Sequence, residues 1–345
     1  MYDKFTHDLE CFAEKCSAYF SSGGLDEYFK TLCADKDIES YYNVFSSHCA
    51  GGKRIRAYLV KTGFELFGKN AGDEIIPPAL SYEIFQTGVL CHDDIIDESP
   101  VRRFRPSMYV ELGANHTGVS RAICQGDLGI IAACGIIARA DFDEKIRLKA
   151  IDHQCRVFFS TVAGELKDVD LSEKPAHILD EILSMYELKT ARYTVSGPLV
   201  LGAILAGQDE SVCKKLDEIG KNIGIAFQIR DDILGIYAHE SVIGKSVTSD
   251  MREGKKTVLS AHFLQKASDK EKQIFEGIYG NALSGDRELE TVKELFKSSG
   301  SLSFAQELCK SYVQKARELL EALQIPSERR EIVEQLLSYM TMREK

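Results

Sequence analysis

The chain is organised around the stretch Cys91-His92-Asp93-Asp94-Ile95-Ile96-Asp97-Glu98, which places the pattern D-D-x-x-D at the end of an apolar segment. On a helix, Asp93 and Asp97 lie on one face, and Asp94 lies about 100° further round. Carboxylates this close repel one another and raise each other's pKa, and a divalent cation relieves both effects. Ligands that are all oxygen favour Mg²⁺. The alternative is a solvated acidic helix end, which opposes the helix dipole.

A second aspartate pair ends another long apolar stretch, Phe227-Gln228-Ile229-Arg230-Asp231-Asp232-Ile233-Leu234. Cations follow both pairs in the chain: Arg102, Arg103, Lys245, Lys255 and Lys256. Metal ions can bridge carboxylates to phosphate oxygens, and lysine or arginine can cover the remaining phosphate charge. The two motifs together therefore predict a site for a metal and a diphosphate.

A third motif, Gly51-Gly52-Lys53-Arg54-Ile55-Arg56, opens another expected helix. Two glycines let the backbone approach a ligand closely, and Lys53 and Arg56 share a helical face. Cations at the start of a helix are unfavourable with its dipole, so this pattern predicts a bound anion. The alternative is a plain loop with a solvated basic turn.

Composition restricts the class of protein. The 345 residues are 44% hydrophobic and 28% charged, which is ordinary for a globular chain. The net charge of −10 argues against a nucleic-acid partner. Ten cysteines without a C-x-x-C pattern, and an N-terminus without a basic and then apolar segment, indicate reduced thiols in the cytoplasm. The apolar runs 128–138 and 194–207 are shorter than the ~18–20 residues of a membrane span, so we expect buried helices there.

Helical periodicity extends through nearly the whole chain, and no convincing strand pattern interrupts it. Pro77-Pro78 begins the segment that carries the first motif, and Gly197-Pro198 is expected to break a helix that starts after Pro175. The other expected helices cover 3–33 with an interruption at Gly23-Gly24, 38–49, 117–139, 143–171, 209–237, 257–266, 270–279, 287–298, 301–323 and 326–342. The class is therefore all-α, with residues 1–345 forming a single domain.

These motifs, in this order, resemble the trans-type isoprenyl diphosphate synthases, or polyprenyl synthetases, from about residue 45 to the C-terminus. Gly51 to Arg56 is similar to the family's G-G-K-x-x-R. Asp93 to Asp97 with Arg102-Arg103 is similar to its first aspartate motif, and Lys189-Thr190 to its K-T element. The second aspartate motif is matched by Phe227, Gln228, Asp231, Asp232, Gly244, Lys245, Asp250 and Lys255.

The resemblance implies a fold and a reaction. The expected fold is the isoprenoid synthase bundle, about ten antiparallel core helices around a deep central cavity, in a homodimer. The expected reaction is Mg²⁺-dependent, head-to-tail condensation of isopentenyl diphosphate with dimethylallyl, geranyl or farnesyl diphosphate. A polar mouth over an apolar shaft suits such substrates.

The resemblance also implies a role for each matched residue. Three Mg²⁺ per active site would be held by Asp93, Asp97 and Asp231, with Asp94, Asp232 and Asp250 close to those ligands. Catalysis would also use Gln228, Thr190 and the Lys189 carbonyl, which face the carbocation. The allylic diphosphate would be bound by Arg102, Lys189, Lys245 and Lys255. Isopentenyl diphosphate would be bound by Lys53, Arg56, Gln86 and Arg103.

Product length is expected to depend on the helix before Asp93. Gly88 and Val89 are small, whereas Phe85 lies about one turn deeper and would limit the product to geranylgeranyl diphosphate. The alternative is a floor formed by a residue from 124–134.

The chain departs from the common pattern at Gly235, where the second motif often has a third aspartate, and at Phe104, where glycine is frequent. The alternative functions are a longer-chain or farnesyl diphosphate synthase, a non-catalytic partner subunit, and a terpene cyclase. The intact first motif argues against the partner subunit. Lys53, Arg56, Arg103 and the absence of tryptophan argue against the cyclase.

Overall fold

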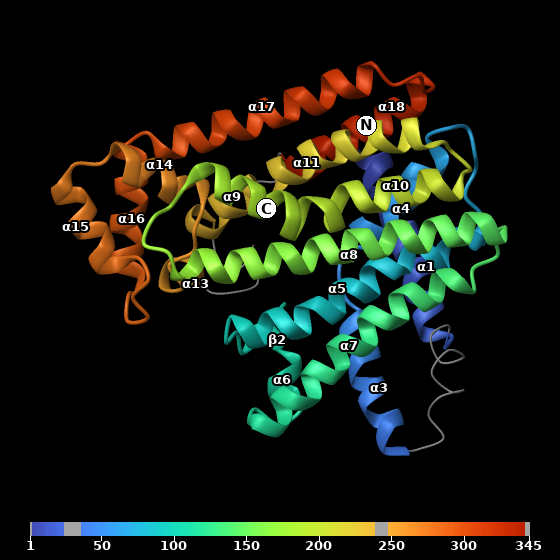
Figure 1. Cartoon of the computed structure of the whole chain (residues 1–345), viewed down its shortest axis with the longest axis horizontal. Helices are drawn as coiled ribbons and strands as arrows, with labels where there is room; N and C mark the ends of the chain where they lie inside the picture. The colour runs from blue at the N-terminus through green and yellow to red at the C-terminus, as the bar shows by residue number, and fades with distance from the viewer. Residues whose placement is uncertain (1, 24–35, 239–247, 342–345) are drawn as a thin grey trace. The chain divides into compact units, whose positions relative to one another are not determined.

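The computed structural model describes residues 2–23, 36–238 and 248–341, and within them the regular structure is helical except for one pair of two-residue strands (Figure 1). Contacts between Cα atoms divide the chain into two compact units. The first comprises Met1–Arg156, Gly197–Leu216 and Ile325–Gln335. The second comprises Val157–Ser196, Asp217–Gln324 and Leu336–Lys345.

The first unit is built around α5, which packs against α4 and α7. Its elements are α1 (Tyr2–Ser21), α3 (Lys36–Cys49), α4 (Ile55–Glu65), a 3₁₀ turn (Asp73–Ile75), α5 (Ile76–Ile96), β1 (Val101–Arg102), β2 (Arg105–Pro106), α6 (Met108–Glu111), α7 (His116–Ala138) and α10 (Gly197–Leu205). Glycines permit the closest helix contacts. A Cβ atom on Gly63 would lie 2.1 Å from the Leu199 carbonyl oxygen, so α4 and α10 require glycine there.

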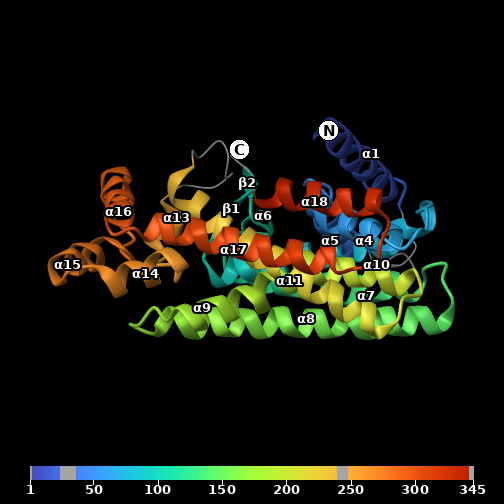
Figure 2. The ribbon, with the colours of Figure 1, turned by 90° about the horizontal axis from the view of Figure 1, so that it is seen from above.

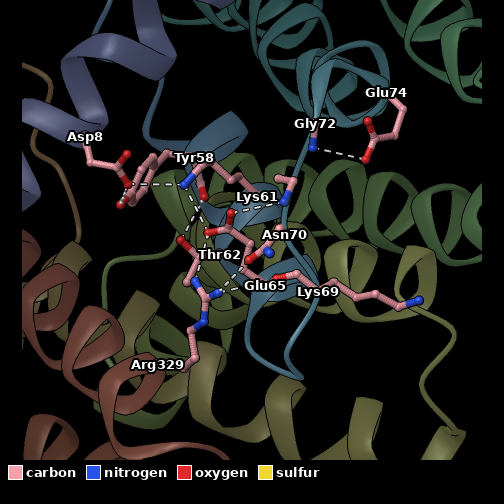
Figure 3. Close-up of polar contacts among 11 residues, drawn as sticks. Asp8, Tyr58, Lys61, Thr62, Glu65, Lys69, Asn70, Gly72, Glu74 and Arg329 are labelled. Atoms are coloured by element: carbon pink, nitrogen blue, oxygen red, sulfur yellow. Dashed lines mark hydrogen bonds and ion pairs between the residues drawn. The ribbon is translucent and has the colours of Figure 1, made fainter.

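A polar cluster ties α1 and the start of α18 (Ser327–Thr341) to α4 (Figure 3). The Tyr58 hydroxyl donates a 2.7 Å hydrogen bond to Asp8, and the Lys61 ammonium lies 3.1 Å from the same carboxylate. Lys61 also contacts Glu65 at 3.0 Å, and Arg329 lies 3.5 Å from Glu65. These contacts hold the outer helices on the first unit.

The second unit contains α9 (Leu179–Met185), the π-helix Tyr186–Ser196, α13 (Ser249–Arg252), α14 (Val258–Lys266), α15 (Asp269–Ile278), α16 (Asp286–Ser298) and α17 (Ser301–Glu321). Helices α14, α15 and α16 gather beside one end of α17 in both views (Figures 1 and 2). Phe263, Phe275 and Phe296 form an aromatic core among them, with ring centroids 4.8 to 5.8 Å apart. The long helices α8 (Glu144–Glu173) and α11 (Glu210–Tyr237) contribute residues to both units.

The all-α expectation is confirmed, and most helix ends fall within a few residues of the expected positions. Two local expectations were wrong. Gly197-Pro198 does not interrupt the helical path, because the π-helix Tyr186–Ser196 leads directly into α10. Pro198 lacks the N–H that would continue the helical hydrogen bonds, and the path changes from π-helix to α-helix at this point. The β1–β2 hairpin was also missed, since two-residue strands are too short to show a period.

Helix α7 (His116–Ala138) matches the expected helix 117–139 and contains the apolar run 128–138. Among the described residues, α7 is the one helix that is long and apolar enough to cross a membrane. Of its most apolar stretch, 44% is buried within the protein. Several of its remaining apolar side chains are exposed, including Ile123, Leu128 and Ile131.

Candidate active site

The first aspartate motif occupies the C-terminal end of α5 in the first unit. Asp94 is buried, Asp93 is half-buried and Asp97 is exposed. Asp97 caps the helix, because its N–H donates to the Asp93 carbonyl at 2.8 Å. The apolar residues before the motif pack into the core, so the helix end carries its carboxylates to the edge of the unit.

Arg102 is the cation that pairs with this motif. Its NH2 group donates to Asp93 at 2.8 Å, and its Nε donates to Asp94. Burial raises the pKa of Asp94, and the Arg102 charge opposes that rise. Asp93 would hold a metal ion, and the Arg102 guanidinium beside it would be placed to bind a phosphate.

The β1–β2 hairpin places Arg102 and Arg103 beside one another. Its two turn residues, Arg103 and Phe104, both have positive φ, 53° and 62°. A two-residue hairpin of this type requires that conformation, which glycine adopts without strain. Phe104 is 74% exposed, so no packing compensates for the strain. The frequent glycine at position 104 thus has a conformational reason.

A basic cluster, defined as Lys53, Arg56 and Arg103, lies in the same unit. Lys53 and Arg103 are exposed and Arg56 is half-buried. Burial and then the Arg56 charge lower the pKa of Arg103. Gly52 has φ 102°, and a Cβ there would come 3.4 Å from Arg103 NH1. The cluster therefore concentrates positive charge as a diphosphate requires. Gln86 lies half-buried on α5.

The protein itself supplies a negative charge at the N-terminus of α4, where the helix dipole favours an anion. The Glu83 carboxylate accepts a 3.1 Å hydrogen bond from the N–H of Ala57 in the first turn of α4. Its other oxygen lies 3.6 Å from Arg54 NH1. The dipole argument alone therefore does not demand a bound ligand at this helix start.

The three expected chain-length residues have different surroundings. Phe85 is fully buried, and Val89 is half-buried. Gly88 packs against α7, where an added Cβ would lie 2.8 Å from the Gly126 carbonyl oxygen. Helix packing therefore requires a glycine at position 88, whatever its relation to the product.

In the second unit, Lys189 lies on the π-helix and is held by two carboxylates of α8. Its ammonium contacts Asp168 at 2.7 Å and Glu165 at 2.9 Å. Gly164 permits this approach, because a Cβ there would lie 2.2 Å from the Lys189 backbone nitrogen. Thr190 is half-buried beside it. π-Helical turns frequently occur at functional sites.

The second aspartate pair lies near the C-terminal end of α11, and buried residues such as Ile233 and Ile236 follow it. Asp231 is half-buried, whereas Asp232 is buried and accepts hydrogen bonds from the Tyr186 hydroxyl and, at 2.9 Å, from the Gln228 amide. Burial raises the pKa of Asp232 to about 7, and these donors and Lys255 oppose the rise. Gln228 thus has a carboxylate partner, and its amide is fixed in orientation.

Of the two lysines assigned to the second motif, Lys245 and Lys255, the structure describes Lys255. Its ammonium lies 3.9 Å from Asp250, whose charge raises the pKa of the lysine. Asp250 also fills the space above Gly235, where a Cβ would lie 2.2 Å from Asp250 Oδ2. The carboxylate of Asp250 therefore occupies the place of a side chain at position 235. Lys245 lies outside the described residues.

The donor set fits Mg²⁺ that shares its coordination with a substrate. Among the residues that the structure describes, no three His, Cys, Asp or Glu side chains are close enough to hold a metal by themselves. Mg²⁺ is usually bound by one or two carboxylates, water and substrate phosphates rather than by a cage of protein ligands. Asp93, Asp97 and Asp231 can serve in this way.

Stability without metal should depend on pH through Asp232. Because its pKa lies near 7 in the folded protein and near 3.8 otherwise, the folded state binds the proton more tightly. The contribution of Asp232 to the free energy of unfolding is therefore fully present below about pH 4. It is lost, on the order of a few kcal/mol, as pH rises through 7. Urea unfolding in a chelator at pH 5 and pH 8 measures this, with Asp232→Asn as control. A difference between the two proteins that is the same at both pH values would contradict the expectation.

Sequence reasoning missed Glu83 and Tyr186, two buried residues that contact the motifs. The partner of Glu83, Ala57, is 26 residues away, and that of Tyr186, Asp232, is 46 residues away. Periodicity within one helix carries no information about such pairs. The available signal was a carboxylate within the apolar run from Leu80 to Phe85.

Comparison with known proteins gives consistent matches along the chain. The polyprenyl synthetase family model matches residues 38–297. Geranylgeranyl diphosphate synthase of Sulfolobus acidocaldarius is 32% identical over 307 residues, which cover 88% of this chain and 89% of the relative. Geranylfarnesyl diphosphate synthase of Aeropyrum pernix is 33% identical over 303 residues, covering 86% and 92%.

A solved structure shows the same fold. Geranylgeranyl pyrophosphate synthase from Corynebacterium glutamicum, in complex with isoprenyl diphosphate and magnesium, matches with a TM-score of 0.89 at 27% identity. The match covers 99% of each chain.

Proposed function

Since the chain belongs to the polyprenyl synthetase family and is a prenyltransferase, we propose that it joins isopentenyl diphosphate head-to-tail to an allylic diphosphate. The observation that carries this proposal is the presence of two kinds of anion-binding group in one unit. One is the aspartate motif with Arg102, which would bind a diphosphate through a metal ion, and the other is the basic cluster, where a Cβ on Gly52 would come 3.4 Å from Arg103 NH1. Two diphosphates need two such groups, whereas a terpene cyclase takes one diphosphate.

Asp93, Asp97 and Asp231 would hold Mg²⁺, three ions per active site. When bound, Mg²⁺ neutralises diphosphate charge and so favours breaking of the allylic C–O bond. The magnesium in the Corynebacterium glutamicum structure supports the use of Mg²⁺ as the metal. The half-buried positions of Asp93 and Asp231 leave their carboxylates within reach of a ligand.

The allylic diphosphate would be bound by Arg102, Lys189 and Lys255, and also by Lys245. The C–O electron pair leaves with the diphosphate, whose charge these cations stabilise. The double bond of isopentenyl diphosphate then attacks the allylic cation. The new cation, on the former isopentenyl unit, loses a proton to the departed diphosphate. Gln228 and Thr190 would face the cation as dipoles, and the Asp232 contact fixes the Gln228 amide for this purpose.

The basic cluster and Gln86 would bind isopentenyl diphosphate. A direct test of two-substrate chemistry is to supply farnesyl diphosphate and Mg²⁺ with and without isopentenyl diphosphate. We expect consumption only when both are present, with one diphosphate released for each isopentenyl unit added. Consumption of farnesyl diphosphate alone would instead favour the cyclase.

We propose that the main product is geranylgeranyl diphosphate, with Phe85 limiting the length of the tail. The Sulfolobus and Corynebacterium relatives, named as geranylgeranyl synthases, support this. The Aeropyrum relative supports geranylfarnesyl diphosphate as the second candidate.

Replacing Phe85 with alanine should lengthen the product beyond C20, because the aromatic ring would no longer block the growing tail. The cavity should also cost about 3–5 kcal/mol of stability. Chromatography of the dephosphorylated products measures the length. Ile84→Ala, at an equally buried position of α5, is the matched control and should leave product length unchanged. An unchanged C20 product from Phe85→Ala would contradict the assignment.

We also propose that the chain is a cytoplasmic homodimer and that residues 1–345 form one domain. The exposed apolar side chains of α7, Ile123, Leu128 and Ile131, support a partner surface on the first unit. The nine described cysteines are all free, which fits a reducing compartment. Light scattering should give twice the mass of one chain.

A further inference from the structure

Glu83 is a buried carboxylate next to the basic cluster. Only 5% of the residue is exposed, yet it lies within the apolar surface of α5. A buried charge is costly unless it is paired and hydrogen-bonded. Glu83 satisfies this requirement through Arg54 and the Ala57 N–H, and both partners belong to the segment that carries Lys53 and Arg56.

Arg54 connects Glu83 to two further helices. Arg54 is 2% exposed. Its NH2 group donates to the carbonyl of Cys49 at the end of α3, and its guanidinium carbon lies 5.1 Å from the centre of the Phe20 ring of α1. Its backbone has φ 55°, a left-handed conformation that arginine rarely adopts. Arg54 therefore points inward while its neighbour Lys53 is exposed.

The same carboxylate acts on the rest of the cluster. Glu83 raises the pKa of Arg103, opposing the cations of Arg56, Arg102 and Arg54 that lower it. Gln86 lies one turn after Glu83 on α5. Without a buried negative charge, the crowded cations would repel one another, and the segment from Cys49 to Ala57 would lose its anchor on α5.

We propose that Glu83 is a positioning residue for isopentenyl diphosphate: its contacts with Arg54 and Ala57 fix the backbone that aims Lys53 and Arg56 at one diphosphate. This inference rests on the proposed function of the basic cluster. Glu83 itself needs no contact with substrate. It acts by holding the two cations in place before the ligand arrives, which removes an ordering cost from binding.

The test is Glu83→Gln, which keeps an oxygen that can accept from Ala57 but removes the charge opposite Arg54. The KM for isopentenyl diphosphate should rise about 10- to 100-fold, because small misplacements of binding groups have effects of this size. The KM for the allylic diphosphate should change less than about twofold, because Arg102 and the second unit are untouched. Arg54→Lys, which keeps the charge and loses the planar fork, should give the same selective rise.

The matched control is Glu65→Gln at the other end of α4. Glu65 pairs with Lys61 and Arg329 (Figure 3). It is the last residue of α4, whereas Arg56 lies in the first turn. The Glu65→Gln substitution should lower the midpoint of thermal unfolding without changing the KM for isopentenyl diphosphate. A Glu83→Gln protein that raises both KM values equally, or leaves that for isopentenyl diphosphate unchanged, would overturn the positioning role.

Failure of the proposed function gives a different result. In that case the wild-type protein itself would neither bind isopentenyl diphosphate nor elongate an allylic diphosphate. If Glu83→Gln does not fold, Arg54→Lys decides the matter through the same pair of KM values. A selective rise supports the inference, and its absence in a folded, active Arg54→Lys protein overturns it.

Discussion

Replacing Asp93 with asparagine should lower kcat about 1,000-fold or more while the protein stays folded. The amide keeps the size of the side chain but loses the charge that would hold Mg²⁺, and loss of one such contribution to charge stabilisation has effects of this order. Arg102 would retain its bond to Asp94, so the hairpin should keep its place. Initial rates of elongation at saturating substrates and increasing Mg²⁺ measure the effect.

Glu98→Gln is the matched control for Asp93→Asn. Glu98 is an exposed carboxylate directly after the motif and outside the D-D-x-x-D pattern. We expect it to retain nearly full activity. A fall of less than about tenfold in the Asp93→Asn protein, or an equal fall in both proteins, would remove Asp93 from the metal-binding residues.

Gly235→Asp should damage the enzyme, although it restores the aspartate that is frequent at this position in the family. Its Cβ would lie 2.2 Å from Asp250 Oδ2, so the Asp250 side chain must move. Asp250 is buried and lies 3.9 Å from Lys255, the cation assigned to the allylic diphosphate. Displacement of that carboxylate, with a second one added, should lower kcat/KM for the allylic substrate about 10- to 100-fold.

Two further variants separate steric from electrostatic causes. Gly235→Ala adds the Cβ without charge, and it should reproduce much of the loss. Gly235→Asp combined with Asp250→Gly moves the carboxylate to position 235 and removes the clash, so it should recover activity relative to Gly235→Asp alone. If Gly235→Asp is as active as the wild type, Asp250 does not depend on the glycine.

The helical fold was predictable because its signal is local. The spacing of apolar residues and the glycine and proline positions indicated most described helices, including α5 and α11 with their aspartate motifs. The π-helix was not predictable in this way, because its extra residue per turn leaves only a small change in spacing. The β1–β2 hairpin was likewise too short to detect, although its turn residues carry both arginines.

The candidate site was predictable as a set of residue types but not as a set of contacts. The motifs named Asp93, Asp94 and Arg102, and the structure places these three together. That Glu83 caps α4, or that Tyr186 donates to Asp232, follows from packing between distant segments, which spacing does not encode. The roles of the site residues in binding substrate and metal stay predictions until the variants are measured.

Elongation is tested most directly by incubating the wild-type protein with labelled isopentenyl diphosphate, Mg²⁺ and dimethylallyl, geranyl or farnesyl diphosphate. The products are dephosphorylated and separated by chain length. We expect Mg²⁺-dependent elongation of each starter, with a C20 alcohol as the main product. A main product of C25 or longer would keep the reaction and contradict Phe85 as the limit. No elongation of any starter would contradict the proposed function itself.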